Sequence, residues 1–477
     1  MAQVHKRKPR TVEELRKSNY PDQTVKEELR KNLIEKIRRG EELFPGIVGY
    51  QDTVIPQFEN AILSGQDIIL LGERGQAKTR MIRSMVNLLD EEIPVLAGCE
   101  INDHPFRPIC HRCRQKIATQ GGKAEILWIS RDQRYGEKLA TPDVTIADLI
   151  GEIDPIKVAE GRYLSDELTI HYGLIPRTNR GIFAINELPD LGEKIQVGLF
   201  NIMEERDIQI RGYKIRLPLD VYIVATANPE DYTNRGRIIT PLKDRYGSEI
   251  RTHYPRSISD EIAIMDRERT RFLEDDGFQV YVPPFLKEII AEITALARKS
   301  SEINQRSGVS VRVSISNFEN LISNALRRAI RLNETEVVPR MSDLPYVAAS
   351  TSGKIELESV EEDRMDRIIG NLIAKASMNT FDRYFQVQQF DDLVARFQGG
   401  WSMEVSETMR STVYEKTARE MQASGRALPG LMEGLKKLKC DHSAAAFASG
   451  LEFILEGLYL HKRLHKETLA GKTSYRA

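Results

Sequence analysis

The pattern of hydrophobic and polar residues changes near Pro255. Before this position, short apolar runs of the kind found in buried strands alternate with stretches whose apolar residues recur at helical spacing. After it, helical periodicity predominates from Ile258 to Ala477. Strands that alternate with helices are typical of a parallel sheet covered on both faces. We therefore predict an α/β domain followed by helical domains.

Several elements can be placed from this pattern. Amphipathic helices are predicted over about 22–39 and 52–63, and "IILL" predicts a buried strand followed by a Gly-containing turn and a further helix. The runs "AEILWIS", "GIFAIN" and "VYIVATA" predict more strands, and 206–220 predicts a hairpin. The segment from Pro94 to Gly122 is irregular and rich in Cys, His and Pro. The predicted organisation is an N-terminal helical segment over 1–42, an α/β domain over 43–255 with a Cys/His-rich insert at about 95–122, a helical domain over 256–380 and a helical C-terminal region over 381–477.

The composition is that of a globular chain with balanced charge. Hydrophobic residues make up 41% and charged residues 29%, the formal net charge is -1 and the pI is about 6.8. This balance gives no overall attraction to nucleic acid or anionic membranes, and we interpret the basic run "HKRKPR" as a solvated tail. The N-terminus lacks the apolar region of a secretory signal, and "AAAFASGLEFILEGLYL" is too short to span a bilayer. We expect a cytoplasmic protein without membrane contact.

The stretch "GERGQAKTR", residues 72–80, lies between a predicted strand and a predicted helix. It matches the phosphate-binding pattern G-x-x-x-x-G-K-[ST], except that Ala77 replaces the second glycine. In such a loop backbone N–H groups face the phosphates, Lys78 reaches the β- and γ-phosphates, and the Thr79 hydroxyl binds Mg²⁺. Alanine suits its position if its φ is negative. The candidate nucleotide-binding residues here are Gly72, Glu73, Arg74, Gly75, Gln76, Ala77, Lys78, Thr79 and Arg80.

Two later strands end in polar residues. "IFAINE" ends in Asn186 and Glu187, and "VATANP" contains Asn228 at the end of its strand. Glu187 can orient or deprotonate an attacking water, whereas Asn186 can accept a hydrogen bond from a metal-bound water but carries no charge. The Asn228 amide can hold that water or the γ-phosphate. A solvated carboxylate and a turn-opening Asn-Pro pair are the alternatives. Together with the loop, these positions favour a nucleotide hydrolase with reduced metal affinity.

This set of motifs resembles that of the AAA+ ATPases. By this resemblance, residues 72–79 are Walker A, "IFAINE" is Walker B, and Asn228 is sensor one. "GLIPRTNRGIFAINELPDL" is similar to the corresponding segment of the magnesium-chelatase ATPase subunits and their MoxR-type relatives. "FPGIVGYQD" is similar to their opening, which puts Val48 and Gly49 near the adenine. The resemblance covers about 43–330 and implies a P-loop parallel-sheet domain followed by a helical lid.

The resemblance also implies catalytic arginines and an assembly. "LKDRYGSEI" is similar to the group's Asp-Arg-Phe segment, so Arg245 is the candidate arginine finger, which acts on ATP bound by a neighbouring subunit. "SVRVSIS" is similar to the sensor-two region and points to Arg312; surface ion pairs are the alternative for both. Segments 140–178 and 206–220 match the insert and hairpin that face the ring pore in this group. The resemblance further implies ATP and Mg²⁺ as cofactors, a hexameric homo-oligomer, a protein client, and a separate partner bearing a von Willebrand A domain.

We therefore expect a chaperone-like ATPase that converts ATP and water to ADP and phosphate and remodels a protein partner. One alternative is the motor subunit of a magnesium chelatase acting on porphyrin, which the long helical region 381–477 disfavours. Another is a nucleic-acid-remodelling AAA+ protein, which the balanced charge disfavours. Because Ala77 and Asn186 depart from the usual motifs, two further alternatives are that hydrolysis is slow or that nucleotide serves mainly as an assembly switch.

The insert contains a cluster of potential metal ligands, namely Cys99, His104, Cys110, His111 and Cys113. Cys110 and Cys113 form the C-x₂-C spacing common in zinc knuckles. Cys99 and one histidine complete four ligands, and His104 is better spaced than His111, which lies between the two thiolates. Reduced cysteines in a loop are the alternative. We predict a structural Zn²⁺ bound by Cys99, His104, Cys110 and Cys113.

Overall fold

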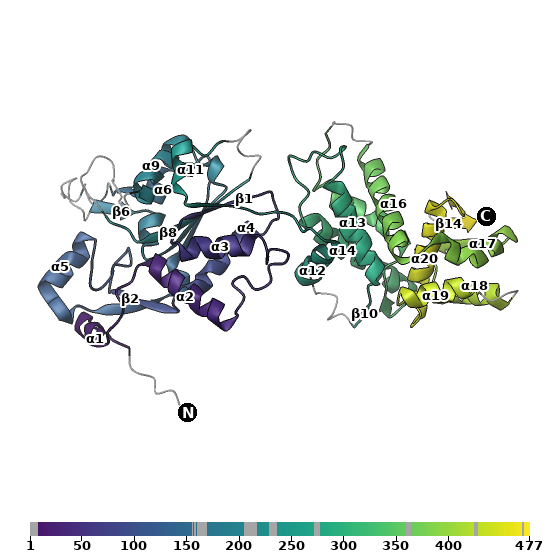
Figure 1. Ribbon diagram of the computed structural model, residues 1–477, viewed down its shortest axis with the longest axis horizontal. Helices are drawn as coiled ribbons and strands as arrows, with labels where there is room; N and C mark the ends of the chain where they lie inside the picture. Colours follow the sequence, from purple (N-terminus) through teal and green to yellow (C-terminus); the bar gives the residue numbers. More distant parts are fainter. Residues whose placement is uncertain are drawn as a thin grey trace, which may run out of the picture. The chain divides into compact units, whose positions relative to one another are not determined.

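The structure is a computed structural model that describes residues 8–154, 156, 159, 169–204, 217–228, 236–270, 277–358, 364–423, 428–469 and 472–477. The chain divides into two compact units, Met1–His253 and Tyr254–Ala477. In Figure 1 the first unit runs from purple to teal and the second from green to yellow. The finer division into four domains stays a prediction.

A parallel sheet forms the centre of the first unit. Its five strands lie in the order β4 (Tyr135–Leu139), β7 (Gly181–Asn186), β8 (Val221–Ala227), β1 (Ile68–Leu71) and β9 (Ser248–Arg251). Leu71 pairs in register with Ala227 on one side and Arg251 on the other. The segments that leave these strands therefore start at the same edge of the sheet, which is where α/β proteins bind ligands.

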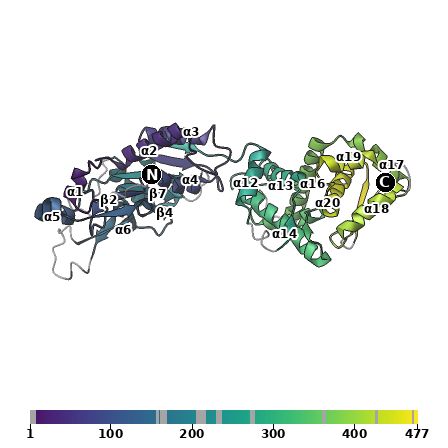
Figure 2. The ribbon, with the colours of Figure 1, turned by 90° about the horizontal axis from the view of Figure 1, so that it is seen from below.

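Helices cover both faces of this sheet, as Figures 1 and 2 show. Neighbouring strand residues point to opposite faces. Ile68 and Leu70 share one core with α2 (Val25–Arg39), α3 (Val54–Leu63) and α4 (Lys78–Ser84). Ile69 and Leu71 share another with α8 (Leu174–Arg177), α9 (Glu193–Glu204) and α11 (Thr240–Arg245). This arrangement confirms the predicted α/β fold class.

A buried ion pair ties α2 to the sheet region. The Arg134 guanidinium, at the end of η3 (Arg131–Arg134), donates to the two Glu28 carboxylate oxygens at 2.7 and 2.6 Å. Both side chains are almost fully buried, at 1% and 4% exposure. Glu28 also accepts the Asp90 backbone N–H at 2.7 Å. The N-terminal helix α2 is thus an integral part of the first unit.

Smaller elements surround the sheet. The strands β2 (Glu92–Leu96) and β3 (Ile126–Ser130) form an antiparallel pair, as do β5 (Gly151–Ile153) and β6 (Ile170–Tyr172). Between β2 and β3 lies α5 (His111–Gln120), so the prediction of a wholly irregular insert is wrong. The periodicity was hidden because α5 buries only Cys113 among its residues. The predicted hairpin at 206–220 lies mostly outside the described residues. The remaining elements here are α1 (Val12–Lys17), η1 (Met85–Leu88), η2 (Gly121–Lys123), α6 (Ile146–Leu149) and η5 (Leu188–Asp190).

The second unit is mainly helical, as predicted, and is built around a core that extends from Met265 to Tyr475. A three-stranded antiparallel sheet, β12 (Met403–Ser406), β14 (Lys472–Arg476) and β13 (His465–Leu469), interrupts the region predicted to be all-helical. In the part of the chain that is described, no helix has the length and apolarity needed to cross a membrane. The other elements are α12 (Ile258–Glu268), β10 (Gln279–Val280), α13 (Pro284–Ala297), α14 (Arg312–Leu332), β11 (Glu336–Val337), η7 (Met341–Val347), α15 (Ala348–Ser352), α16 (Arg364–Tyr384), η8 (Val387–Phe390), α17 (Asp391–Gln398), α18 (Ser411–Ala423), α19 (Pro429–Lys437) and α20 (Ala444–Leu460).

Candidate functional site

The predicted phosphate-binding loop connects β1 to α4. Gly75 and Ala77 both have positive φ, at 77° and 57°. The expectation of a negative φ at Ala77 is therefore wrong: the chain needs a left-handed residue before Lys78 and uses alanine for it. The Ala77 side chain crowds its own backbone there at a cost of about 1–2 kcal/mol. The loop thus keeps the conformation that glycine would supply.

Close packing holds the base of this loop. A Cβ added to Gly72 would lie 1.9 Å from Thr252 Oγ1 and 2.2 Å from Gln76 Oε1, so only glycine fits. The Thr252 hydroxyl donates to Gln76 Oε1 at 2.6 Å. The Tyr50 hydroxyl lies 3.0 Å from the Gln76 carbonyl oxygen, and burial raises the pKa of Tyr50 to about 12, so it remains a donor. The loop is anchored from two sides before any ligand binds.

Lys78, Asn228 and Glu187 form a connected chain of hydrogen bonds. Lys78 Nζ donates to the backbone carbonyl oxygens of Gly72 and Glu73, the latter at 2.9 Å, and to Asn228 Oδ1 at 2.7 Å. Asn228 Nδ2 in turn donates to Glu187 Oε2 at 2.6 Å. The structure therefore brings together the loop lysine and the polar ends of β7 and β8, residues that the sequence separates by more than a hundred positions.

Glu187 lies in a constrained backbone position. Its φ is 57°, in the left-handed region that non-glycine residues rarely adopt. Its backbone N–H donates to Thr226 Oγ1 at 3.1 Å, which fixes the turn after β7. Strained backbone of this kind is concentrated at functional sites. The turn presents the Glu187 carboxylate next to Asn228.

The uncharged Asn186 lies beside a carboxylate that sequence reasoning missed. Asn186 Nδ2 donates to Glu137 Oε1 at 2.6 Å. Arg83 donates twice to the same carboxylate at 2.8 Å, and the Tyr135 hydroxyl donates at 3.0 Å. The Arg83 guanidinium is the main reason that the pKa of Glu137 is lowered, so this carboxylate is ionised.

Glu137 also determines the orientation of the Asn186 amide. An ionised carboxylate only accepts hydrogen bonds, so the amide nitrogen must face Glu137 and the amide oxygen must point elsewhere. That oxygen accepts the Thr226 hydroxyl at 3.3 Å. Glu137 therefore fixes Asn186 as an acceptor, the role a metal-bound water requires. A pattern search could find Glu137 only by first recognising β4, whose sequence "YGEKL" lacks an apolar run.

The remaining candidate residues lie around or away from this group. Thr79, the second residue of α4, is half-buried, and Arg74 and Arg80 are exposed. Gly49, with φ of 80°, and the half-buried Val48 directly precede Tyr50, which contacts the loop. The hydroxyl of Thr79 and the amide oxygen of Asn186 are hard oxygen donors of the kind Mg²⁺ uses, so the residues present fit a magnesium ion.

The two arginines assigned by resemblance lie elsewhere. Arg245, the last residue of α11, donates from Nε to Glu204 Oε2 at 3.0 Å and lies 4.8 Å from the centre of the Phe200 ring. Arg312 begins α14 in the second unit and is exposed. Neither has a described contact with Lys78 or Glu187. Their catalytic roles stay predictions.

A cavity of about 400 Å³ opens beside the loop in the first unit. Gly72, Glu73 and Gln76 line it on the loop side, and Lys243, Arg251 and Thr252 line it from α11 and the end of β9. Its size is within the range of small-molecule sites. Its wall carries two cationic side chains and one carboxylate, and both cations pair with Glu249, Lys243 at 2.9 Å and Arg251 at 3.4 Å.

The cysteine cluster assembles with one change from the prediction. Cys99, Cys110 and Cys113 lie together, but Asp103 accompanies them in place of His104. His104 Nδ1 accepts the Phe106 N–H at 3.1 Å, and its Nε2 lies 3.6 Å from Asp22 Oδ1. Burial lowers the pKa of His104 to about 3, so the ring is neutral. The adjacent residue, not the histidine, faces the thiols.

Comparison with known proteins identifies relatives of this chain. The magnesium-chelatase subunit ChlI of Nostoc sp. is 27% identical over 268 residues, covering 54% of this chain and 65% of that protein. The ChlI homolog of Methanocaldococcus jannaschii is 26% identical over 234 residues, covering 47% and 58%. These similarities support the AAA+ group of the magnesium-chelatase/MoxR type. The predicted resemblance is thereby confirmed.

Other comparisons add little to this assignment. The chain spans less than two thirds of the length of these ChlI relatives, and no protein-family model matches it. The solved complex between the magnesium-chelatase subunits BchI and BchD is 19% identical and covers 70% of this chain and 94% of that one, with a TM-score of 0.35. NtrX from Brucella abortus in complex with ATP is 13% identical and covers 82% and 72%, with a TM-score of 0.40.

Proposed function

We propose that this AAA+ chain binds ATP at the loop 72–79, hydrolyses it, and uses the energy to remodel a protein partner. The observation that supports this best is the hydrogen-bond chain from Lys78 through Asn228 to Glu187. It joins the group that would neutralise the phosphates to the group that would activate water. An ordinary strand–turn–helix has no reason to assemble these residues at one sheet edge.

Each residue has a defined task in this proposal. Lys78 and the loop N–H groups hold the phosphates. Thr79 and Asn186 would hold Mg²⁺ and its water, with Glu137 as the positioning residue of Asn186; the bound ion supplies positive charge to the phosphate oxygens. Glu187 orients or deprotonates the attacking water, as its place beside Asn228 supports. The neighbouring cavity, whose wall includes Lys243 and Arg251, would accept the rest of the nucleotide.

The assembly and partners that we propose follow the group. Arg245 would act on ATP bound by the next subunit of a homo-oligomeric, hexameric ring, and Arg312 would contact nucleotide from the lid. The client is a protein, with a separate von Willebrand A-domain protein as the candidate partner and the cytoplasm as the location. Because the similar proteins are magnesium-chelatase subunits, the motor of a magnesium chelatase is the second candidate function.

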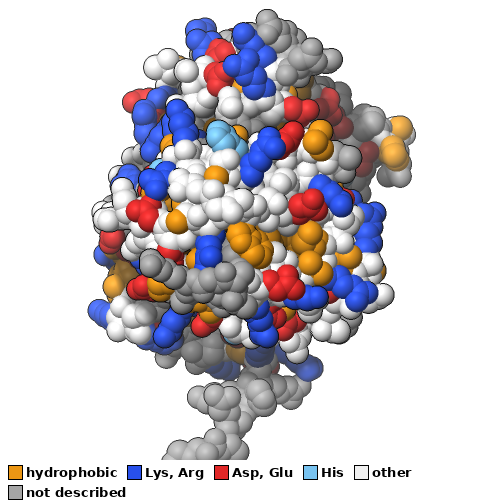
Figure 3. All heavy atoms as spheres, turned by 90° about the vertical axis from the view of Figure 1, so that its right-hand side faces the viewer, with side chains coloured by type: hydrophobic (Ala, Val, Ile, Leu, Met, Phe, Trp, Pro, Cys, Tyr) orange, Lys and Arg blue, Asp and Glu red, His pale blue; other side chains and the backbone are white. Residues whose placement is uncertain are grey.

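A nucleic-acid-remodelling function is less well supported. Sequence-independent binding to nucleic acid requires a field of positive charge. The face of the molecule in Figure 3 instead mixes Lys and Arg with Asp and Glu. The formal net charge of -1 agrees with this mixture.

The decisive experiment uses Glu187→Gln in the full chain. We expect ATP binding to be retained and hydrolysis to fall by about 10²–10⁴-fold, the usual contribution of a general base. Affinity capture with this variant in ATP should retain the client. The matched control is Glu193→Gln, because Glu193 is exposed on α9. This variant should hydrolyse ATP at the rate of the parent protein. An unchanged rate for Glu187→Gln would reject the proposed role of this carboxylate.

A further inference from the structure

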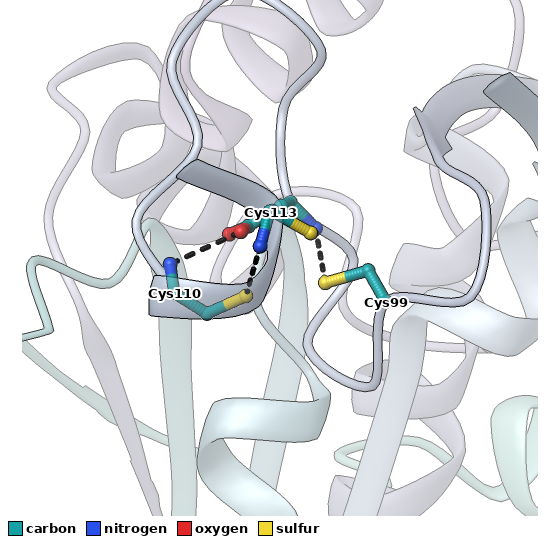
Figure 4. Close-up of side chains that lie close together, drawn as sticks. Cys99, Cys110 and Cys113 are labelled. Atoms are coloured by element: carbon teal, nitrogen blue, oxygen red, sulfur yellow. Dashed lines mark hydrogen bonds between the residues drawn. The ribbon is translucent and has the colours of Figure 1, made fainter. Parts of the chain in front are cut away.

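The insert between β2 and β3 gathers three thiols and a carboxylate that the proposed nucleotide chemistry does not use. The Sγ atoms of Cys99, Cys110 and Cys113 and a carboxylate oxygen of Asp103 all lie within 4.8 Å of one another. Cys99 is half-buried and the other three are buried. Figure 4 shows the cysteine side chains directed toward one another, Cys99 from the loop after β2 and the other two from the start of α5.

We propose that Cys99, Asp103, Cys110 and Cys113 bind a structural Zn²⁺ ion. This site is separate from the proposed ATPase function and does not depend on it. Three thiolates and one carboxylate supply the four sulfur and oxygen donors that a closed tetrahedral zinc site uses. With Zn–S bonds of about 2.3 Å, tetrahedral ligand atoms lie roughly 3.8 Å apart. Small side-chain rotations therefore complete the site from the observed positions.

Asp103 provides an independent reason for a cation at this place. Its side chain is fully buried, at 0% exposure. Its Oδ2 accepts the Cys110 N–H at 3.1 Å, but its Oδ1 is buried without a hydrogen-bond partner. Leaving a buried carboxylate oxygen unpaired is strongly unfavourable, whereas a bound cation satisfies it.

Backbone N–H groups around the cluster donate to two of its sulfur atoms. The Cys113 N–H donates to Cys110 Sγ at 3.4 Å, and the Asp103 N–H donates to Cys99 Sγ at 3.4 Å. Cys110 is also the N-cap of α5, so the positive end of the helix faces its sulfur. These hydrogen bonds fix the positions of the Cys110 and Cys99 sulfur atoms.

The site would hold the shape of the whole insert. It joins the chain just after β2 to the first turn of α5, across a segment with little regular structure. The insert in turn contacts the rest of the first unit: Asn179 Nδ2 donates to the Ile101 carbonyl oxygen at 3.0 Å, and Asn102 Nδ2 donates to the Arg177 carbonyl oxygen at 3.0 Å. Zinc would therefore fix the insert against the segment that leads into β7.

The test is metal content of the full chain, purified without chelators and measured by elemental analysis. We expect about one Zn²⁺ per chain, as four protein ligands in one closed site require. Cys113→Ser should lose at least half of it, while Cys440→Ser, which alters a buried cysteine of the second unit, should keep it. His104→Ala should keep zinc and Asp103→Asn should bind it more weakly. Replacement of the bound Zn²⁺ by Co²⁺ gives a second readout on the unmodified chain. Co²⁺ bound by thiolates in tetrahedral geometry should absorb intensely in the visible and near-ultraviolet.

Two results would overturn the proposal. Zinc below about a tenth of an equivalent, even after incubation of the reduced protein with Zn²⁺, would leave only thiols or a disulfide. Loss of zinc in His104→Ala, with full retention in Asp103→Asn, would reject Asp103 as the fourth ligand. Neither readout involves ATP, so failure here is distinguishable from failure of the proposed ATPase activity.

Discussion

At the scale of single residues, Ala77 is a glycine position occupied by alanine. Its φ of 57° carries the steric penalty described above, which glycine would not have. We expect Ala77→Gly to raise the free energy of unfolding of the first unit by about 0.5–1 kcal/mol, because relief of strain outweighs the added freedom of the unfolded chain. Denaturant unfolding can be followed by Trp128 fluorescence in a Trp401→Phe background.

The control for Ala77→Gly is a change of opposite sign. Ala61→Gly, inside α3, should lower the same free energy by about 1 kcal/mol, since a helix interior disfavours glycine. Equal destabilisation by both substitutions would contradict the strain at Ala77.

Glu137 tests whether a neighbouring carboxylate offsets the missing charge of Asn186. In Glu137→Gln the amide of Asn186 loses its fixed acceptor and Arg83 loses its ion partner. We expect the Mg²⁺ concentration for half-maximal ATP hydrolysis to rise about ten-fold, the effect usual for groups that orient metal ligands, with a smaller change in the maximal rate. Steady-state ATPase assays at varied Mg²⁺ measure both quantities.

The comparison variant for Glu137 is Glu41→Gln, an exposed ion-paired glutamate outside the site, which should leave the Mg²⁺ dependence unchanged. A purely structural role for Glu137 would instead lower the rate at every Mg²⁺ concentration without moving the midpoint.

At the scale of elements, what could be predicted depended on burial. The central strands β1, β7 and β8 are buried on both faces, so their apolar runs are visible in the sequence. The edge strand β4 and the C-terminal strands β13 and β14 carry charged or half-exposed residues and gave no such run. The hydrophobic pattern therefore located the buried strands and missed these more exposed strands.

The residues of the candidate site also divide into those that follow a recognisable strand and those that do not. Lys78, Glu187 and Asn228 stand next to recognisable strands, so their proximity could be anticipated from a parallel sheet. Glu137 could not, because its strand was not recognised. Asp103 and His104 are adjacent in sequence, and spacing alone does not tell which side chain turns toward the thiols; only the folded backbone shows this.

At the scale of the whole molecule, the proposed ring predicts complementation between defective subunits. Lys78→Ala removes the phosphate ligand of its own site, and Arg245→Ala removes the finger offered to the next subunit. Each variant alone should be nearly inactive. In an equal mixture, an Arg245→Ala subunit can be completed by a Lys78→Ala neighbour, and random assembly makes about a quarter of the interfaces competent. Measuring ATPase rates before and after mixing tests this.

The control mixture pairs two defects within one site. Lys78→Ala with Glu187→Gln should recover nothing, because both residues act in the same subunit. Recovery in neither mixture would mean that Arg245 does not act across an interface. Equal recovery in both would show that the three residues are not divided between subunits as proposed.

The contacts of Lys78 link the proposed phosphate-binding group to the proposed catalytic carboxylate. Its ammonium is committed to loop carbonyls and to the Asn228 amide, and the same amide holds Glu187. Phosphates that draw Lys78 away would remove its hydrogen bond to Asn228 Oδ1, so phosphate binding and the position of the catalytic carboxylate are linked through the Asn228 side chain. A nucleotide that lacks both the β- and the γ-phosphate would leave the Lys78–Asn228–Glu187 hydrogen bonds in place. We therefore expect the surroundings of Glu187 to change when the phosphates of a nucleotide bind Lys78.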